Sequence, residues 1–565
     1  MKPHGHLLAS APACALGLTA LLGCSDPFAP KIEPPPELED CAASMEWVVD
    51  GGGKYTATPA LDMFLPAPHP TTECPFYRGG WQTFLQATQP VDAAGTPAFA
   101  TSRYPTIDDV FTPKVAHGAN RSYLGDIKQA GKREILIDQN GKTLYYSIQV
   151  NQAFADFIHV NKLETSTAIQ AYPSDPVKKN LFFPAGVSEF KAAWQVVDGD
   201  AAAIADQTKD YISMVTSIPT MHTVTDPATG VTSIEENRDQ PIKNVTVRLL
   251  ALHAVFTLPG HPEFIWASFE HSAGTPDAGT RDNKRNLAPT LEGQNPTADD
   301  ENNRMVGTVV SDKENFFLLY KPGTAANHAN ISISEDCMGN PTNCLHLNEA
   351  QQRFIDPATN QPQQTSIYRM FAASKSNTTE ADEAITSLNN NVEHLFQMAS
   401  DMQVLPANDK RRFYRLLGGQ WMDKPKFYHN NFPIQNDATS PYAQTPGSDA
   451  DIFGVGIGQT QFKAQLEIDG ADSQYSILAG EDRMSSTAME SFTQFAGSFP
   501  NCFSCHNTQA ITAHGTPVNT DRTSFKLLDP GLLNVSHVIS QFVLEDCGSK
   551  VVTDTDGSKR ADCTM

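Results

Sequence analysis

The chain has 565 residues, of which 64 are acidic and 41 are basic, and its formal charge is -23. This length exceeds that of one ordinary domain, and the composition excludes collagen, coiled coil and wholesale disorder. No basic stripe is present to neutralise phosphates, so we expect no nucleic-acid partner. The acidity favours solubility or, alternatively, the docking of basic partners.

The first residues have the features of a targeting segment. Lys2 precedes an apolar run, Leu7 to Leu22, which is too short and too rich in small residues to span a membrane. The run ends in Leu21-Leu22-Gly23-Cys24, which resembles the lipobox of bacterial lipoprotein signals. The resemblance implies a signal peptide over 1–24 and a lipid on Cys24, with plain secretory cleavage as the alternative.

The segment after the signal connects it to the body of the protein. Ser25 is similar to an outer-membrane sorting residue, which implies a cell-envelope protein on the outer membrane, facing the periplasm or the cell surface. Residues 25–40 include Pro34-Pro35-Pro36 and are predicted to form a stiff tether. No later segment is long and apolar enough to span a membrane.

Residues 41–480 are predicted to form a large α+β region. In chain order, we expect a helix over 74–85, a hairpin over 134–148, a helix from 151 through 158, a segment at 188–197 that precedes a further strand, strands over 245–256, 263–271 and 316–320, and a helix from 379 through 396. Asn140-Gly141 suits the hairpin turn, and Asn151 suits a helix cap. Residues 412–421 fit either a helix end or a strand, and 272–304 and 435–449 are predicted loops.

Near the C-terminus, Cys502-Phe503-Ser504-Cys505-His506 has the Cys-x-x-Cys-His spacing of a c-type haem attachment site. Two thiols one helical turn apart each add to a vinyl group of the porphyrin, and His506 then binds the iron. A zinc site or a redox dithiol is the alternative, but the tail has no second Cys-x-x-Cys and no βαβ unit. We therefore expect one covalent haem c with His506 as its proximal ligand.

The segments that flank this motif are predicted to be helical. One helix, capped by Ser485 or Ser486, carries Met489, Phe492 and Phe495, and an apolar helix runs from Pro530 through Val543. A helix before the motif and one at the end resemble the crossed helices of class I cytochromes c. The resemblance implies a small all-α haem domain over 481–565.

The sixth iron ligand differs from that family's pattern. Class I cytochromes usually supply a downstream methionine, but after the motif only the terminal Met565 is available. His537, in the apolar helix, is the expected distal ligand, and a hydrogen-bonded core histidine is the alternative. His514 follows the motif too closely to reach the other face, and Met484 and Met489 are more typical of a core. Two protein ligands favour electron transfer, whereas an open position favours oxidant activation or ligand binding.

The remaining cysteines are even in number. We expect Cys14 to be removed with the signal peptide, Cys24 to carry the lipid, and Cys502 and Cys505 to bind the haem, which leaves six cysteines. In an oxidising compartment an even remainder favours disulfides. Six cysteines allow 15 pairings, and the sequence does not choose among them. The pairing of neighbours along the chain would be Cys41–Cys74, Cys337–Cys344 and Cys547–Cys563.

One stretch of the large region resembles a known group. Trp266-Ala267-Ser268-Phe269-Glu270-His271, with Lys191-Ala192-Ala193-Trp194 before it and the haem motif after it, is similar to little-characterised bacterial "cytochrome c family" proteins. The resemblance implies a long N-terminal region joined to one C-terminal haem, with an electron-transfer or haem-binding role.

Three residues of this region are candidates for a second site. His253, Glu270 and His271 would converge if the strands at 245–256 and 263–270 pair as a hairpin. A His-Glu-His set suits a transition metal or acid–base catalysis. Neighbouring residues of a regular strand point to opposite faces, however, so Glu270 and His271 are more typical of satisfied core residues.

The leading hypothesis is an exported, membrane-anchored mono-haem cytochrome c that passes single electrons to a redox partner protein. The second is a haem-dependent oxidoreductase, peroxidase-like or oxygenase-like, with a substrate site between the two parts. The third is a non-catalytic binding lipoprotein stabilised by its haem.

Overall fold

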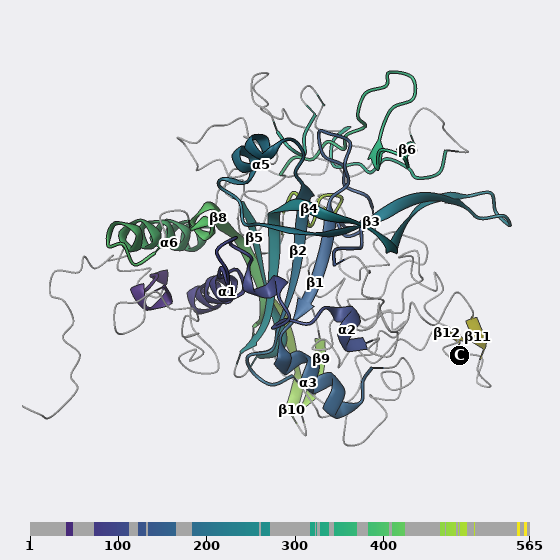
Figure 1. The fold of residues 1–565 in the computed structure, drawn as a ribbon. Helices are drawn as coiled ribbons and strands as arrows, with labels where there is room; N and C mark the ends of the chain where they lie inside the picture. Colours follow the sequence, from purple (N-terminus) through teal and green to yellow (C-terminus); the bar gives the residue numbers. More distant parts are fainter. Residues whose placement is uncertain are drawn as a thin grey trace, which may run out of the picture.

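The structure is a computed structural model (Figure 1). It describes residues 41–48, 73–111, 123–131, 134–164, 183–258, 261–271, 317–321, 324, 328–337, 344–369, 382–405, 409–423, 464–468, 471–481, 484, 486–493, 502, 551–553 and 559–561. The predicted signal peptide, the tether and the loops predicted at 272–304 and 435–449 lie outside these residues.

The fold is α+β, and an eight-stranded sheet forms its centre. The strand order is β1-β2-β4-β5-β8-β10-β9, with β3 paired to β4 outside this path, and all pairings are antiparallel. The strands are β1 Tyr145–Val150, β2 Ser188–Val196, β3 Ser213–Thr225, β4 Thr232–Leu258, β5 His261–His271, β8 Tyr414–Asp423, β9 Ala464–Ile468 and β10 Ala471–Gly480. The outer parts of β3 and β4 form a ribbon that projects beyond the sheet (Figure 1).

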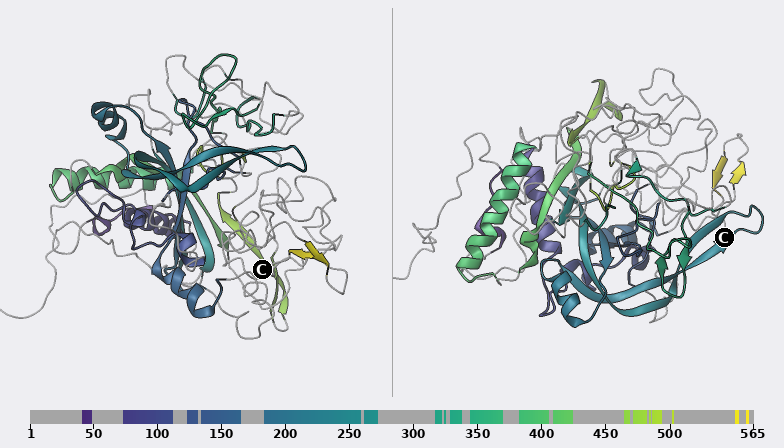
Figure 2. Two further views of the ribbon diagram at one scale, coloured as in Figure 1. Left: turned by 45° about the vertical axis from the view of Figure 1, so that its right-hand side comes forward. Right: turned by 90° about the horizontal axis from the view of Figure 1, so that it is seen from above.

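Two helices, α1 (Cys74–Ala87) and α6 (Glu383–Asp401), cover one face of the sheet. They lie side by side in the view from above in Figure 2. The other described helices are α2 Ile107–Phe111, α3 Gln152–Asn161 and α5 Ala201–Thr208, with 3-10 turns η2 Met45–Trp47, η3 Ala98–Ala100 and η9 Lys410–Phe413. Short strand pairs are β6 Leu347–Asn348 with β7 Arg353–Phe354, and β11 Val551–Thr553 with β12 Lys559–Ala561.

The face covered by α1 and α6 holds the larger core. Phe84 of α1 stacks on Phe269 of β5 with ring centroids 4.4 Å apart. Gly80 permits this close approach, because a Cβ there would lie 2.9 Å from the Ala267 Cβ. Asn389 of α6 joins the layers: its Oδ1 accepts from Trp81 Nε1 at 3.1 Å, and its Nδ2 donates to a β8 carbonyl at 2.9 Å. Shape and buried hydrogen bonds therefore both fix the helices on the sheet.

Most of the predicted local elements are confirmed. The predicted helix at 74–85 is α1, the strands at 245–256 and 263–271 lie in β4 and β5, and the helix through 396 is α6. The hairpin turns at Gly141, which has a φ of 75°. Asn151 caps α3, because its side chain accepts a hydrogen bond from the Phe154 N–H at 3.0 Å. Asp382, rather than a residue near 379, caps α6.

Three further segments remain to be compared with their predictions. Residues 188–197 contain β2 itself, and the ambiguous residues 412–421 lie mostly in β8. The strand predicted at 316–320 is wrong for 317–320, the part of it that the structure describes. Leu318 O accepts from Gln139 N at 3.1 Å, whereas Leu319 O accepts from Ile367 N at 2.7 Å. These carbonyls bind the segments at 139 and 367, and the buried residues 317–320 form no strand.

The region predicted as an all-α haem domain is described only in parts. It contains the two-stranded pair β11–β12, so its described residues are not purely helical. The first strand of that pair has the sequence Val551-Val552-Thr553, three β-branched residues that favour extended backbone.

Candidate haem attachment site

Only the first residue of the Cys-x-x-Cys-His motif, Cys502, belongs to the described part of the chain. Cys505, His506, the predicted distal ligand His537 and the predicted lipidation site Cys24 lie outside it.

Cys502 is attached to the central sheet through its backbone. It is half-buried, and its N–H donates a hydrogen bond to Gln420 Oε1 at 2.8 Å. Gln420 lies in β8 and is fully buried, and its Nε2 donates to the Glu481 carbonyl at 2.7 Å. One buried amide therefore joins the start of the motif, the middle of the sheet and the residue that follows β10.

Residues 486–493, the docking segment, pack against the sheet face opposite α1 and α6. Ala488, Met489 and Phe492 belong to a buried cluster that includes Tyr146 and Ala251. Met489 thus fills a core, the role that the sequence favours for it over iron ligation. The cluster brings the chain back to the sheet shortly before Cys502.

The helix predicted over the docking segment is wrong, since its described residues form turns. Tyr146 OH donates to the Ala488 carbonyl at 2.7 Å, and the Phe492 N–H donates to the Ala130 carbonyl at 3.3 Å. Ser486 N–H donates to the Glu490 side chain at 2.7 Å. A helix would pair the Ala488 carbonyl with the Phe492 N–H, but here these groups bind the sheet and the neighbouring loop instead.

Glu270 on β5 holds the docking segment at the sheet centre. Its carboxylate is fully buried, pairs with Arg369 and accepts hydrogen bonds from the Thr487 hydroxyl and from the Thr487 N–H, the latter at 3.0 Å. Burial raises the pKa of Glu270, and the positive charge of Arg369 opposes that rise. These contacts make Glu270 a satisfied structural carboxylate.

His253 on β4 contacts the same segment. Its Nε2 lies 2.6 Å from Glu490 Oε1, an ion pair when the imidazole is protonated. His253 pairs with Ser268 across the two strands, and Ala251 pairs with Glu270, so His253 and Glu270 lie on one face. The predicted hairpin is confirmed, and two of its three candidate residues bind the docking segment.

His271 does not join them. Its Nε2 is 2.9 Å from the Asp210 carbonyl oxygen, and its ring stacks on Tyr211 with centroids 3.7 Å apart. As expected for adjacent strand residues, it points away from Glu270. A joint His-Glu-His metal or catalytic site is therefore not formed by these described residues.

Glu481 is a buried acid that the sequence reasoning missed. Its carboxyl accepts hydrogen bonds from Tyr77 OH at 2.6 Å and from the Gly419 N–H. Burial raises the pKa of Glu481 to about 8, although both hydrogen bonds lower it. Gly418 leaves room for it, because a Cβ there would lie 2.5 Å from the carboxyl oxygen. The pairing of β8 with β10 and the packing of α1 on β8 bring these residues together, so no local pattern could have revealed the site.

Two of the three predicted disulfides are present. Cys41–Cys74 and Cys337–Cys344 have Cα separations of 4.9 and 5.2 Å, whereas Cys547 and Cys563 lie outside the described residues. The second disulfide has His346 beside it, and these three side chains form the one cluster of potential metal ligands that the described residues contain.

Comparisons with protein-family models, with curated proteins and with solved structures found no match. Within the described ranges, no helix has the length and apolar character needed to cross a bilayer.

Proposed function

We propose that this chain is an exported, lipid-anchored c-type cytochrome that carries one covalent haem and transfers single electrons. The observation that carries the proposal is the Cys502-Phe503-Ser504-Cys505-His506 motif. Its two thiols would form the thioether bonds, His506 would bind the iron, and His537 is the proposed distal ligand. A small haem domain over 481–565, mainly helical and including the pair β11–β12, is part of the same proposal.

The described residues are compatible with a haem at this position. Cys502 is half-buried and belongs to neither described disulfide, which suits a side chain that must meet a porphyrin. Bound haem would supply a one-electron iron couple. Gln420 and the docking segment would hold the start of the attachment site at a fixed position against the sheet.

The cell envelope is the proposed location. The lipobox-like Leu21-Leu22-Gly23-Cys24 would supply a lipid anchor in the outer membrane, facing the periplasm or the cell surface. The two disulfides support an oxidising compartment. In this proposal the large region docks a redox partner protein or shapes its access to the haem, and the acidity of the chain favours a basic partner.

The first experiment tests whether haem is covalently attached to the chain. The full chain is produced with cytochrome c maturation machinery, and haem is quantified by the pyridine haemochrome spectrum and by peptide mass spectrometry. We expect one haem per chain that survives denaturation and is lost in the Cys502→Ala/Cys505→Ala variant. The matched Cys337→Ala/Cys344→Ala variant should keep it. Wild-type protein with both motif sulfurs free, or bound to zinc, would refute the proposal.

Carbon monoxide separates an electron carrier from an oxidant-activating haem. If protein side chains fill both axial positions, the reduced spectrum stays unchanged when carbon monoxide is added. A shifted spectrum would contradict the carrier. A His537→Ala variant whose spectrum equals that of the wild type would remove His537 as the distal ligand.

A further inference from the structure

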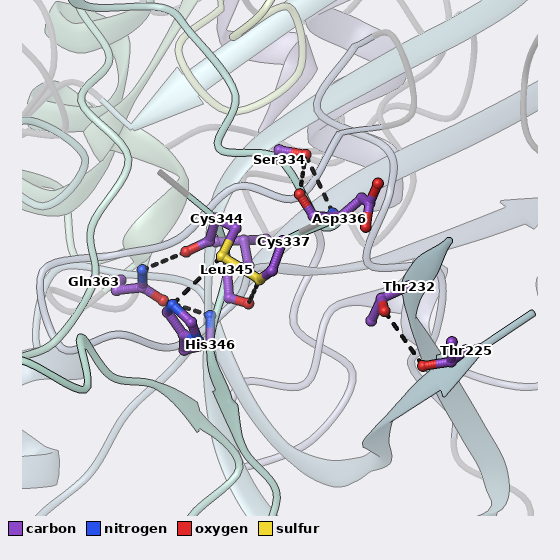
Figure 3. The surroundings of a disulfide bond; sticks show 9 residues. All are labelled: Thr225, Thr232, Ser334, Asp336, Cys337, Cys344, Leu345, His346 and Gln363. Atoms are coloured by element: carbon purple, nitrogen blue, oxygen red, sulfur yellow. Dashed lines mark hydrogen bonds between the residues drawn. A yellow bond between two sulfur atoms is a disulfide. The ribbon is translucent and has the colours of Figure 1, made fainter. Parts of the chain in front are cut away.

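Two cysteines and a histidine lie together beside the short strands β6 and β7, apart from the haem motif (Figure 3). One potential ligand atom from each of Cys337, Cys344 and His346 lies within 4.8 Å of the other two. The distance from Cys344 Sγ to His346 Nε2 is 3.4 Å. In the structure the two sulfurs are bonded to each other, so neither is a thiolate.

The backbone around this cluster is held by contacts that do not depend on the disulfide. Gln363 Nε2 donates to the Cys344 carbonyl at 2.8 Å, and Gln363 Oε1 accepts from the His346 N–H at 2.7 Å (Figure 3). Between them, the Leu345 N–H donates to the Ser334 carbonyl at 2.7 Å. Cys344 and His346 should therefore keep their relative positions when the disulfide is opened.

We propose that Cys337, Cys344 and His346 form a redox-gated site for a thiophilic metal ion of the Zn²⁺ class. Two thiolates and an imidazole are ligands that Zn²⁺ prefers, and water would complete a four-coordinate site. The disulfide closes the site and its reduction opens it. This site does not depend on the haem.

The chemical step needs a two-electron reductant, and the class that we propose for it is a dithiol. By thiol–disulfide exchange, the reductant gives two electrons and two protons to Cys337 and Cys344 and itself becomes a disulfide. When the metal binds, both thiols release their protons to water, and His346 binds as neutral imidazole.

The geometry needs little rearrangement. Zinc bonds of about 2.3 Å to sulfur and about 2.0 Å to nitrogen place tetrahedral ligands roughly 3.5–3.8 Å apart. The sulfur–nitrogen distance of Cys344 and His346 is already 3.4 Å. The two sulfurs have to separate to that range, and Cys337 Sγ starts within 4.8 Å of the His346 ligand atom. Cys337 and His346 are half-buried, so an ion can reach the site from solvent.

The test titrates Co²⁺, a spectroscopic substitute for Zn²⁺, into the full chain with Cys502→Ser and Cys505→Ser, which removes the haem and its competing thiols. A phosphine is used under native conditions, because Cys41 and Cys74 are 0% and 4% exposed and should stay oxidised. Alkylation and mass spectrometry show which thiols have been opened. We expect one equivalent of Co²⁺ with a thiolate charge-transfer band after reduction and none before, and displacement by Zn²⁺.

Variants decide whether these three residues bind the ion. His346→Ala keeps both thiols and should weaken Co²⁺ binding by at least about tenfold. His159→Ala, on α3, is the matched control and should bind as the parent does. Elemental analysis of the haem-loaded wild type before and after reduction repeats the test without the serine substitutions. No metal uptake after confirmed opening of Cys337–Cys344, or equal affinity in His346→Ala, would overturn the proposal.

Discussion

Replacing Glu481 by glutamine tests whether the environment around this acid is as buried as the structure shows. Burial raises the pKa of Glu481 from 4.5 to about 8, so the folded protein carries the carboxyl neutral at pH 7. The unfolded chain loses that proton near pH 4.5. The contribution of this raised pKa to the free energy of unfolding is therefore fully present below pH 4.5, and it is lost as the pH rises to about 8.

The magnitude follows from the same two pKa values. A change from 4.5 to about 8 corresponds to roughly 5 kcal/mol in the free energy of unfolding. Glutamine cannot ionise, and it can still accept from the Gly419 N–H while its amide donates to the Tyr77 oxygen. Relative to wild type, the unfolding free energy of Glu481→Gln should therefore rise by roughly 3–5 kcal/mol between pH 5 and pH 8.

The assay is urea denaturation of wild type, Glu481→Gln and the exposed control Glu46→Gln across this pH range. Other buried acids, such as Glu236 with a pKa of about 7, titrate in all three proteins and cancel in the differences. The free energy of unfolding of Glu46→Gln should change with pH in parallel with that of wild type. If the Glu481→Gln profile also runs parallel to wild type, Glu481 ionises near its ordinary pKa and the reasoning is refuted.

Three further substitutions act on the contacts between the sheet and its neighbours, and each is measured by urea denaturation. Gln420→Leu leaves buried polar groups unpaired and should cost about 1–3 kcal/mol in the free energy of unfolding, and it should lower incorporation of the proposed haem at Cys502. Unchanged values for both would contradict the role of Gln420. Arg369→Met leaves the Glu270 carboxylate buried without its cation and should lower the free energy of unfolding by about 3–5 kcal/mol. Adding Glu270→Gln should recover most of this loss, and a double variant no more stable than Arg369→Met would argue against the ion pair. Gly80→Leu should cost about 1–3 kcal/mol or more, because α1 cannot approach the sheet with a large side chain there, and wild-type stability would disprove that contact.

Local sequence signals were reliable where neighbouring residues decide the structure. The apolar spacing of α1 and α6, the turn at Gly141 and the Asn151 cap depend on residues within one or two turns of each other. The spacing of Cys502, Cys505 and His506 is a signal of the same kind, and it carries the proposed haem chemistry without any fold.

The same local signals failed where distant partners compete for the backbone. The docking segment has a helical apolar pattern, but Tyr146 and Glu270 hydrogen-bond its groups from strands far away in the chain. The apolar run at 316–320 was predicted as a strand, yet its described residues 317–320 hydrogen-bond the segments at 139 and 367 without forming one. Periodicity reports which face is buried, and it does not report which partner covers that face.

By itself, the sequence determined most of the local elements, the Cys-x-x-Cys-His spacing and the cysteines available for pairing. Only the tertiary structure decided that Glu270 and His253 both bind the docking segment, and that Tyr77 and Glu481, 404 residues apart, share a buried hydrogen bond. The physical reason is that spacing along the chain sets backbone conformation over a few residues, whereas strand pairing brings distant groups together and removes them from water. Burial and partner then set the charge state of each acid, and neither can be known before the sheet has formed.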